Sequence, residues 1–445
     1  MMLGSRRSVV FIAAFVAVAT ALPVLALTGS TDLPADVSEP AERLLSEVED
    51  VVTVFNSGAL TSDVAQRALQ AVTAAGGTGE IGRSASTGMQ RVRRGGAVVQ
   101  EAPSGAAFPM ATTMLPTRAV FALMGPSVAA ALSSTSLVMG ERTARLRGAQ
   151  AGDTVDLVAS NGTVLVYRIG AVVADDITGG TELLMSIAGA DRLGVTRLSR
   201  IVLWDFDSRA DIDRELAAND LVSTSIRIRR TWDAFDPDLT LGMAETKEAL
   251  GEFWYKVSSG GSGVSISLDW YYANIDRSGP IGKLNLRSGC HRVVRVALAS
   301  AMAEVIALGL ENTIDYSDAN SAGGCWTARF SRQSPNSSIG FLSRHTWGMA
   351  VDTNTQGSCL GCAPPDMDCR TVRVFRKHGF AWGGNFLRPD GMHFEWVGAP
   401  RHQGLYPSRY CPNVESATSA ALGDDTQRST LFVEDGLRSG DSDEH

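Results

Sequence analysis

The stretch SRHTWGMAVD, residues 343–352, is the part of this 445-residue chain on which the prediction of its fold and chemistry depends. Its second half alternates as a half-buried strand does, so the apolar side chains point to one face and Asp352 points to the other. His345 precedes this strand by a short turn, in which Gly348 lets the backbone fold the imidazole back toward the carboxylate. The stretch therefore predicts an imidazole and a carboxylate that face one site.

A second stretch, DGMHFEW at residues 390–396, carries the same alternation. The period of two places His393 and Glu395 on one face, and the aromatic Phe394 and Trp396 on the other. The aromatic face would hold the strand against a core. His393 is then directed at a site rather than into packing.

Together the two stretches contain the ligands of a catalytic zinc ion. Such sites take three protein ligands and leave a position for water, whose pKa falls to about 7. His345, Asp352 and His393 would fill the three positions. Asp390 would accept the proton of that water and pass it to a leaving amine. An isolated His-x6-Asp is more often a hydrogen-bonded pair, and His291 is the one credible rival ligand, but the downstream Asp-x-x-His favours zinc.

The combined pattern resembles the M15 family of zinc peptidoglycan peptidases, over roughly residues 240–412. The residues that carry the resemblance are Ser-x-His-x-x-Gly-x-Ala-x-Asp from Ser343, Trp-Gly-Gly from Trp382, and Asp-x-x-His-Phe-Glu from Asp390. The resemblance implies zinc as cofactor, and Asp390 as catalytic base. It also implies that Ser343, Glu395 and Trp382 orient a ligand or the substrate.

The family also has a strand arginine that steadies the developing oxyanion or the substrate carboxylate. Its nearest counterpart lies in WTAR at residues 326–329, on a strand predicted over residues 324–330, so Arg329 is assigned this role. An Asp at position 390 is closer to the L-alanyl-D-glutamate endopeptidases than to the D-alanyl-D-alanine carboxypeptidases, which usually have Glu. The prediction is an endopeptidase acting on peptidoglycan stem peptides. The alternatives are a carboxypeptidase with the same site, or a non-catalytic protein of wall binding or envelope assembly.

All six cysteines lie between residues 290 and 411. In an exported chain disulfides persist, so three bridges are favoured over a second, structural zinc site at the Cys-x-x-Cys motif. Fifteen pairings are possible. Cys290 with Cys325 is the favoured pair because both flank core elements, and two more pairs would come from Cys359, Cys362, Cys369 and Cys411.

The N-terminus predicts export. Residues 9–27 carry no charge and follow Arg6 and Arg7. Their length lies between a signal-peptide core and a full membrane span. Residues 1–30 are therefore interpreted as a secretory signal peptide or an anchor in the cytoplasmic membrane, and the anchor is favoured because no clean cleavage site follows. The rest of the chain would lie outside the cytoplasm.

The remaining chain is divided by its patterns into four parts. Residues 31–117 are predicted to form a helical hairpin or stalk followed by a linker, because apolar residues recur at helical spacing up to Phe55 and again after Ser62. Residues 118–235 are interpreted as a β-rich domain of unknown role, with a hairpin at the Asn-Gly of residues 161–162. Residues 236–412 form the catalytic domain and residues 413–445 an acidic, disordered tail.

The fold class expected for the catalytic domain is α+β, with a small antiparallel sheet that has helices on one face and zinc on the other, as the resemblance implies. With 44% apolar residues the chain has material for two folded units. Its formal charge of −8 lies mostly in the tail. The folded part is therefore nearly neutral, which gives no electrostatic reason to expect nucleic-acid binding.

Overall fold

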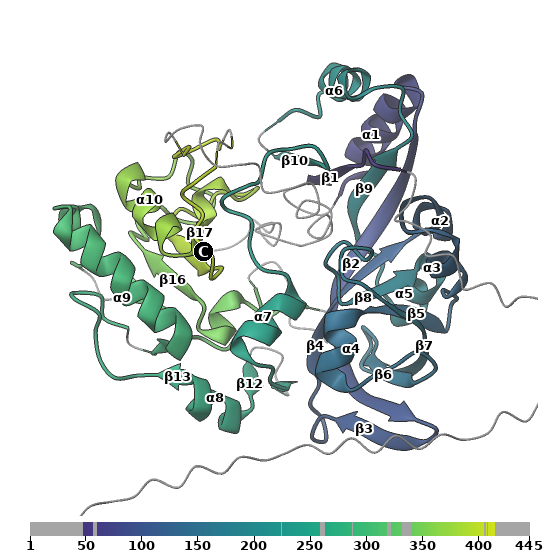
Figure 1. Ribbon diagram of the computed structural model, residues 1–445, viewed down its shortest axis with the longest axis horizontal. Coiled ribbons are helices and arrows are strands. Elements are labelled where there is room, and N and C mark those ends of the chain that lie inside the picture. The colour runs from purple at the N-terminus through teal and green to yellow at the C-terminus, as the bar shows by residue number, and fades with distance from the viewer. Residues whose placement is uncertain are drawn as a thin grey trace, which may run out of the picture. The chain divides into compact units, whose positions relative to one another are not determined.

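One long strand, β2 (Thr78–Arg94), organises the N-terminal half of the chain, because it pairs with β3, β4, β6 and β9 (Figure 1). The computed structural model describes residues 48–56, 60–223, 225–258, 263–286, 288–317, 322–331, 340–404, 406 and 408–413. The predictions for the N-terminal anchor and the acidic tail fall outside these residues. No helix within the described ranges is long and apolar enough to cross a bilayer.

The sheet around β2 has ten strands among the described residues, in the order β10-β1-β9-β2-β4-β8-β5-β7-β6, with β3 beside β2. Most neighbours are antiparallel, while β4 with β8 and β5 with β7 are parallel. The other strands are β1 (Val52–Asn56), β3 (Ala97–Glu101), β4 (Phe108–Leu115), β5 (Ser136–Gly140), β6 (Thr154–Val158), β7 (Val164–Val173), β8 (Leu183–Ser186), β9 (Leu198–Trp204) and β10 (Ile226–Arg230). The accompanying helices are α1 (Ser62–Ala74), α2 (Thr117–Met124), α3 (Pro126–Ala130), α4 (Glu141–Arg147), α5 (Ile187–Leu193) and α6 (Arg209–Ala218).

The predicted helix that ends at Phe55 is wrong over its described part, because residues 52–56 form β1. Val52, Val54 and Phe55 are buried, and β1 lies between β9 and β10 in the sheet. A strand covered on both faces is apolar throughout, and such a run cannot be distinguished from a buried helix by periodicity. The second predicted helix is confirmed as α1, whose first-turn amide at Val64 donates to the Thr61 side chain.

The predicted linker over residues 75–117 is also wrong, since β2, β3 and β4 lie there. The small residues of β2 are weak strand formers on their own. They are held in a strand because partners pair along both edges, and at Gly79 a Cβ atom would lie 2.8 Å from Leu69 and 2.9 Å from Leu203. The sheet thus takes strands from both sides of the predicted boundary at residue 118. The predicted hairpin at residues 161–162 is confirmed as β6 and β7.

The C-terminal half is built on a second, four-stranded antiparallel sheet in the order β15-β16-β18-β17. With the first sheet it confirms the mixed α+β class. Its strands are β15 (Ala322–Gly324), β16 (Ala350–Thr353), β17 (Phe380–Trp382) and β18 (His393–Trp396), and three short 3-10 helices are η1 (Glu311–Thr313), η2 (Arg344–Trp347) and η3 (Gly383–Asn385). The other elements are α7 (Met243–Leu250), β11 (Tyr255–Val257), β12 (Val264–Ile266), α8 (Leu268–Asn274), β13 (Ile275–Asp276), β14 (Cys290–His291), α9 (Arg292–Ala307) and α10 (Cys369–Lys377).

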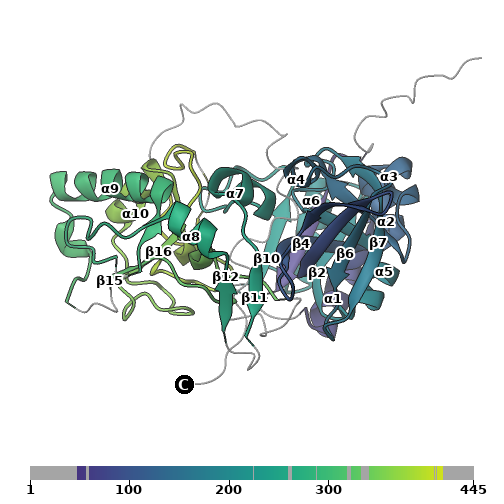
Figure 2. The same cartoon turned by 90° about the horizontal axis from the view of Figure 1, so that it is seen from below.

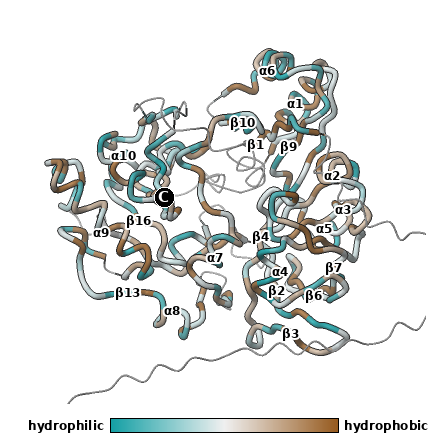
Figure 3. Tube along the Cα trace, viewed as in Figure 1, coloured by the Kyte–Doolittle hydropathy of each residue, from teal (hydrophilic) through white to brown (hydrophobic). Residues whose placement is uncertain are grey.

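Helices α9 and α10 lie side by side near the four-stranded sheet (Figures 1 and 2). Helix α9 is rich in apolar residues (Figure 3), and Val294, Leu298, Met302 and Val305 form its buried stripe. On α10, the Phe375 ring lies 4.2 Å from that of Phe394, measured between centroids. Phe394 therefore packs toward α10, which leaves the opposite face of β18 for His393.

Three disulfides cross-link the C-terminal half. The predicted pair Cys290–Cys325 is confirmed, and the other four cysteines form Cys359–Cys362 and Cys369–Cys411. The Cys-x-x-Cys motif is therefore a disulfide in this structure and does not contribute to a second zinc site. Cys325 lies just after β15, so the first bridge ties the edge of the small sheet to the start of α9.

A buried ion cluster joins α7 to the ten-stranded sheet; we define it as Arg147, Glu182, Lys247 and Glu252. Lys247 Nζ lies 2.8 Å from Glu182 Oε1 and 3.1 Å from Glu252 Oε1, and Arg147 Nη2 lies 2.6 Å from Glu252 Oε1. The side chains of Arg147, Glu182 and Lys247 have 0% exposure. Burial would raise the pKa of Glu252, but Arg147 and Lys247 lower it from its ordinary 4.5 to about 2.

This pKa predicts an acid-sensitive contribution to stability. A carboxylate with a depressed folded-state pKa stabilises the fold fully above pH 4.5, and the contribution is lost as the pH falls toward about 2. The shift corresponds to about 3 kcal/mol. Glu252→Gln is expected to lower the free energy of unfolding at pH 7 by this order, and to flatten its decline in acid. Urea denaturation across pH 2 to 7 measures both; Glu248→Gln, on the exposed side of α7, is the control.

Candidate metal centre

Two of the predicted ligands face each other across a strand pair. In the antiparallel register of β16 and β18, Asp352 is opposite His393, and the next position pairs Val351 with Phe394. Val351 and Phe394 are both fully buried. Directly opposed residues on one face have their Cβ atoms about 5 Å apart, so the register alone brings this carboxylate and imidazole together.

The third predicted ligand, His345, lies on η2, directly before β16. The Ser343 hydroxyl accepts a hydrogen bond of 3.3 Å from the His345 amide and so caps this turn. Gly348 ends the turn with φ of 63°, and a Cβ atom there would lie 2.7 Å from the His291 nitrogen. Only glycine fits this left-handed position, which confirms the turn that the sequence predicts at Gly348.

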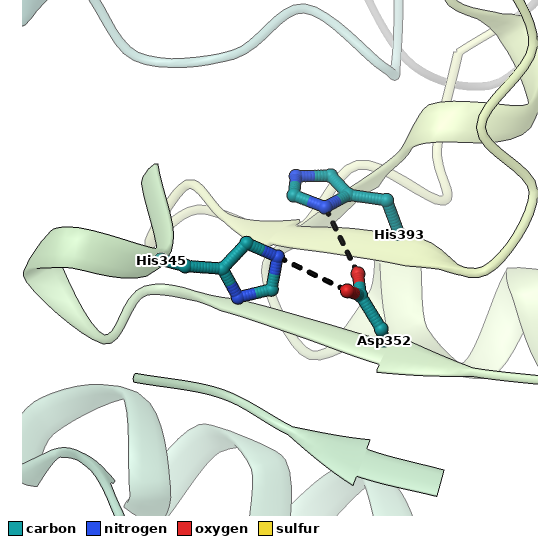
Figure 4. A group of neighbouring side chains, drawn as sticks. All are labelled: His345, Asp352 and His393. Carbon is teal, nitrogen blue, oxygen red and sulfur yellow. Dashed lines mark hydrogen bonds and ion pairs between the residues drawn. The ribbon is translucent and has the colours of Figure 1, made fainter. Parts of the chain in front are cut away.

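The His345 ring is oriented through both of its nitrogens. Its Nδ1 lies 2.6 Å from the carbonyl oxygen of Cys325, to which it donates. That hydrogen bond leaves Nε2 without a proton in the neutral ring, and Nε2 lies 3.2 Å from Asp352 Oδ2 (Figure 4). Backbone carbonyls that hold the far nitrogen of a histidine are typical of metal sites, because they fix the tautomer that binds the ion.

His393 faces Asp352 with the other ring nitrogen, Nδ1 instead of Nε2. Its Nδ1 lies 3.1 Å from Asp352 Oδ1 (Figure 4), and its Nε2 lies 3.5 Å from Glu395 Oε2. Burial would lower the pKa of His393, but the hydrogen bonds to Asp352 and Glu395, together with the charges of Asp352 and Asp390, raise it to about 10. Burial would likewise raise the pKa of Asp352, which the two imidazoles instead hold well below its usual range.

These three side chains fit a divalent metal. One ligand atom from each of His345, Asp352 and His393 lies within 4.8 Å of the others. The donor set of two imidazole nitrogens and one carboxylate oxygen is that of catalytic zinc sites, and each imidazole has its remaining nitrogen beside a carbonyl or a carboxylate. Asp352 and His393 also shift each other's pKa in opposite directions, as a carboxylate and an imidazole in contact do.

Asp390 lies beside this group in the turn that leads into β18. Its amide donates to the Gly383 carbonyl at 2.8 Å, and its own carbonyl accepts from the His393 amide at 3.0 Å. The side chain is half-buried, and its charge contributes to the raised pKa of His393. Asp390 therefore belongs to the same turn as His393, and its backbone is bonded to that of the ligand candidate.

Gly383, on η3, is the close-contact position that keeps this turn in place. A Cβ atom at residue 383 would lie 2.5 Å from the Asp390 carbonyl oxygen and 3.1 Å from His393 Cβ. Gly383→Ala is expected to lower the free energy of unfolding by about 2 kcal/mol, the usual cost of overpacking, and to weaken metal binding. Chemical denaturation and metal titration measure the two effects. Gly324→Ala is the control, because no atom lies within 4 Å there and its backbone, like that of Gly383, is outside the left-handed region; equal losses of stability in both variants would contradict the crowding account.

Arg329 is not delivered by a strand, so that part of the prediction is wrong. Strand β15 ends at Gly324, and residues 325–329 have no strand geometry. The Cys325 disulfide and a hydrogen bond of 3.0 Å from the Thr327 amide to the His345 carbonyl hold this segment against η2 instead. The Arg329 carbonyl accepts from the Ser343 amide at 2.9 Å. The structure thus places the Arg329 backbone beside the turn of His345.

Trp382 and His291 have packing roles in this structure. Trp382 has 0% exposure, and its Nε1 donates to the Gly391 carbonyl at 2.8 Å, which supports the turn after Asp390. His291 is buried, with Nε2 lying 3.2 Å from the Leu250 carbonyl oxygen and Nδ1 accepting from the Val293 amide. The rival ligand of the sequence analysis therefore caps α9 and stands outside the ligand group.

Sequence reasoning missed Arg344, which is buried next to the ligand group. Its Nε lies 3.2 Å from Oε1 of Glu395, the carboxylate that contacts His393. The signal was present, because a glutamate on the ligand face of a buried strand requires a cation nearby. The cation is one residue before the first ligand histidine.

The geometry defines a class of site, a His-Asp-His group that could hold a metal ion. The family follows from comparison: residues 336–396, which contain all three ligands, match the M15 peptidase family model described as D-alanyl-D-alanine carboxypeptidase. The C-terminal region of the chain therefore contains a peptidase domain of the M15 family. No curated protein matches the chain.

Proposed function

We propose that this protein is a zinc-dependent peptidase that hydrolyses the stem peptides of peptidoglycan during cell-wall remodelling. One observation carries the proposal: His345, Asp352 and His393 converge within 4.8 Å inside the segment that matches the M15 peptidase model. A zinc ion held by these ligands would act as a Lewis acid on the scissile carbonyl and lower the pKa of water. The remaining chemistry belongs to the chain's own residues.

Asp390 acts as general base and then as general acid. It takes a proton from the attacking water and returns it to the leaving amine, a role that fits a half-buried carboxylate one turn away from the ligand group. Arg329 stabilises the negative charge that develops on the substrate, or binds a substrate carboxylate. Ser343 holds the His345 amide and keeps that ligand oriented.

The bond we propose is the internal L-Ala–D-Glu bond, on the basis of aspartate at position 390. The competing activity is release of the terminal D-Ala, which the description of the matching family model favours. Both use the same ligands and the same base. An extracytoplasmic location, with an N-terminal segment in the cytoplasmic membrane, is part of the proposal and is supported by the pairing of all six cysteines in disulfides.

The test uses the full chain, purified with and without chelator, and purified peptidoglycan stem pentapeptides analysed by mass spectrometry. Elemental analysis should find about one zinc per chain. Internal cleavage that stops with chelator and returns with added zinc is expected. Free D-Ala as the product would instead establish the carboxypeptidase. Binding to the wall without any cleavage, even with zinc added, would replace the peptidase with a wall-binding or envelope-assembly role.

A further inference from the structure

Arg344 is a buried arginine on η2 whose guanidinium contacts two other parts of the chain, β18 and the segment that includes α7. Its Nε lies 3.2 Å from Glu395 Oε1. Its Nη1 donates to the Thr246 hydroxyl at 2.8 Å, and its Nη2 donates to the Leu241 carbonyl. The other oxygen of Glu395 lies 3.5 Å from His393 Nε2. Arg344, Glu395 and the proposed metal ligand His393 are therefore connected by successive side-chain contacts.

The contacts from Arg344 through Glu395 to His393 determine which nitrogen of His393 would face a metal. A carboxylate beside Nε2 keeps the proton there, so Nδ1 is free to bind a cation. Glu395 has 3% exposure, and a buried carboxylate is favoured only where a cation or hydrogen-bond donors lie beside it. The planar fork of arginine can serve a carboxylate, a hydroxyl and a carbonyl at once, whereas the ammonium of lysine cannot take this arrangement.

The groups that hold Arg344 belong to α7 and the residues before it, and α7 is held in turn by the ten-stranded sheet. Lys247 follows Thr246 directly and is one of the two cations of the buried ion cluster, paired with Glu182 at 2.8 Å. It also donates to the Pro109 carbonyl of β4. Beyond the end of α7, the Phe253 ring lies 4.5 Å from the Trp347 ring of η2. Helix α7 therefore contacts the sheet on one side and the turn of His345 on the other.

We propose that the ten-stranded sheet is part of the support of the metal site, with Arg344 as the positioning residue through which α7 holds Glu395 and His393. This role rests on the proposed function, since it requires that His393 binds a metal. On this proposal the N-terminal half contributes to the metal site even if it binds no ligand itself. The buried ion cluster then affects metal affinity through its contacts with α7.

The test is the zinc dissociation constant of the full chain, measured by competition with a chromogenic chelator, alongside thermal unfolding of the metal-free protein. Arg344→Met is expected to weaken zinc binding about 10- to 100-fold, the usual effect of removing a group that orients a ligand. Arg344→Lys keeps the charge and should recover only part of the loss. Thr246→Val removes a single hydrogen bond and provides a milder variant if Arg344→Met does not fold.

The coupling to the sheet is tested by the double variant Lys247→Met, Glu182→Gln, which removes one charge of each sign. Folded double variant should bind zinc several-fold more weakly. The matched control is Lys377→Met, which breaks the 2.7 Å pair with Glu304 on the surface and should leave the affinity unchanged. Full zinc affinity in folded Arg344→Met or in the double variant would overturn the inference alone. A wild-type chain that binds no zinc would overturn the proposed function as well.

Discussion

His345→Ala is expected to remove the bound metal and to reduce peptide hydrolysis roughly a thousandfold or more, because the metal lowers the pKa of water from about 15.7 to about 7. His345 supplies Nε2 toward the shared site while the Cys325 carbonyl holds Nδ1. Alanine leaves two ligands, which is fewer than a catalytic zinc site retains. Elemental analysis after dialysis and initial-rate assays on a stem peptide measure the two losses.

The control for this variant is His378→Ala. His378 is half-buried in the same half of the chain and pairs with Glu304 at 2.7 Å, beyond the end of α10. The His378→Ala variant should keep one metal per chain and the full rate of peptide hydrolysis. Retention of stoichiometric metal by His345→Ala, with the rate unchanged, would contradict the assignment of the ligand group and would point to a metal elsewhere.

The ligand group could be predicted because the necessary information is local. Alternation over residues 348–352 and 392–396 determines which side chains share a face, and Gly348 determines the turn before them. The one long-range step is the register that pairs Asp352 with His393. A register shift of one residue in β18 would have turned His393 toward α10 and away from Asp352, so the apolar residues Val351 and Phe394 select the observed pairing.

The fold of the N-terminal half was harder to predict, because its strands are stabilised by pairing with strands that are distant in the sequence. The glycines, the serines and the one alanine of β2 have no strand preference of their own, and they form a strand because β4, β6 and β9 pair with them. Arg344 was missed for the same reason. Its contacts are with Glu395 and with the segment around α7, which local periodicity does not connect to it.

Asp390→Asn is expected to keep the metal and lose the reaction. The amide has nearly the shape of the carboxylate, so the backbone hydrogen bonds of residue 390 with Gly383 and His393 remain. It cannot take up a proton from water, and positioned general acid-base catalysis contributes about 10²- to 10⁴-fold. The turnover number should fall by that factor, while the zinc stoichiometry stays at that of the wild type.

Comparison of His345→Ala with Asp390→Asn distinguishes residues that bind the metal from the residue that transfers the proton. Asp368→Asn is the control for the change of charge, because asparagine preserves the cap that Asp368 forms on the Arg370 amide, and its rate should be unaffected. If Asp390→Asn lost zinc as His345→Ala does, Asp390 would be a ligand rather than the base. If it kept both zinc and turnover, the proton would pass through another group, and Glu395 on the ligand face would be the next carboxylate to test, since it lies 3.5 Å from His393.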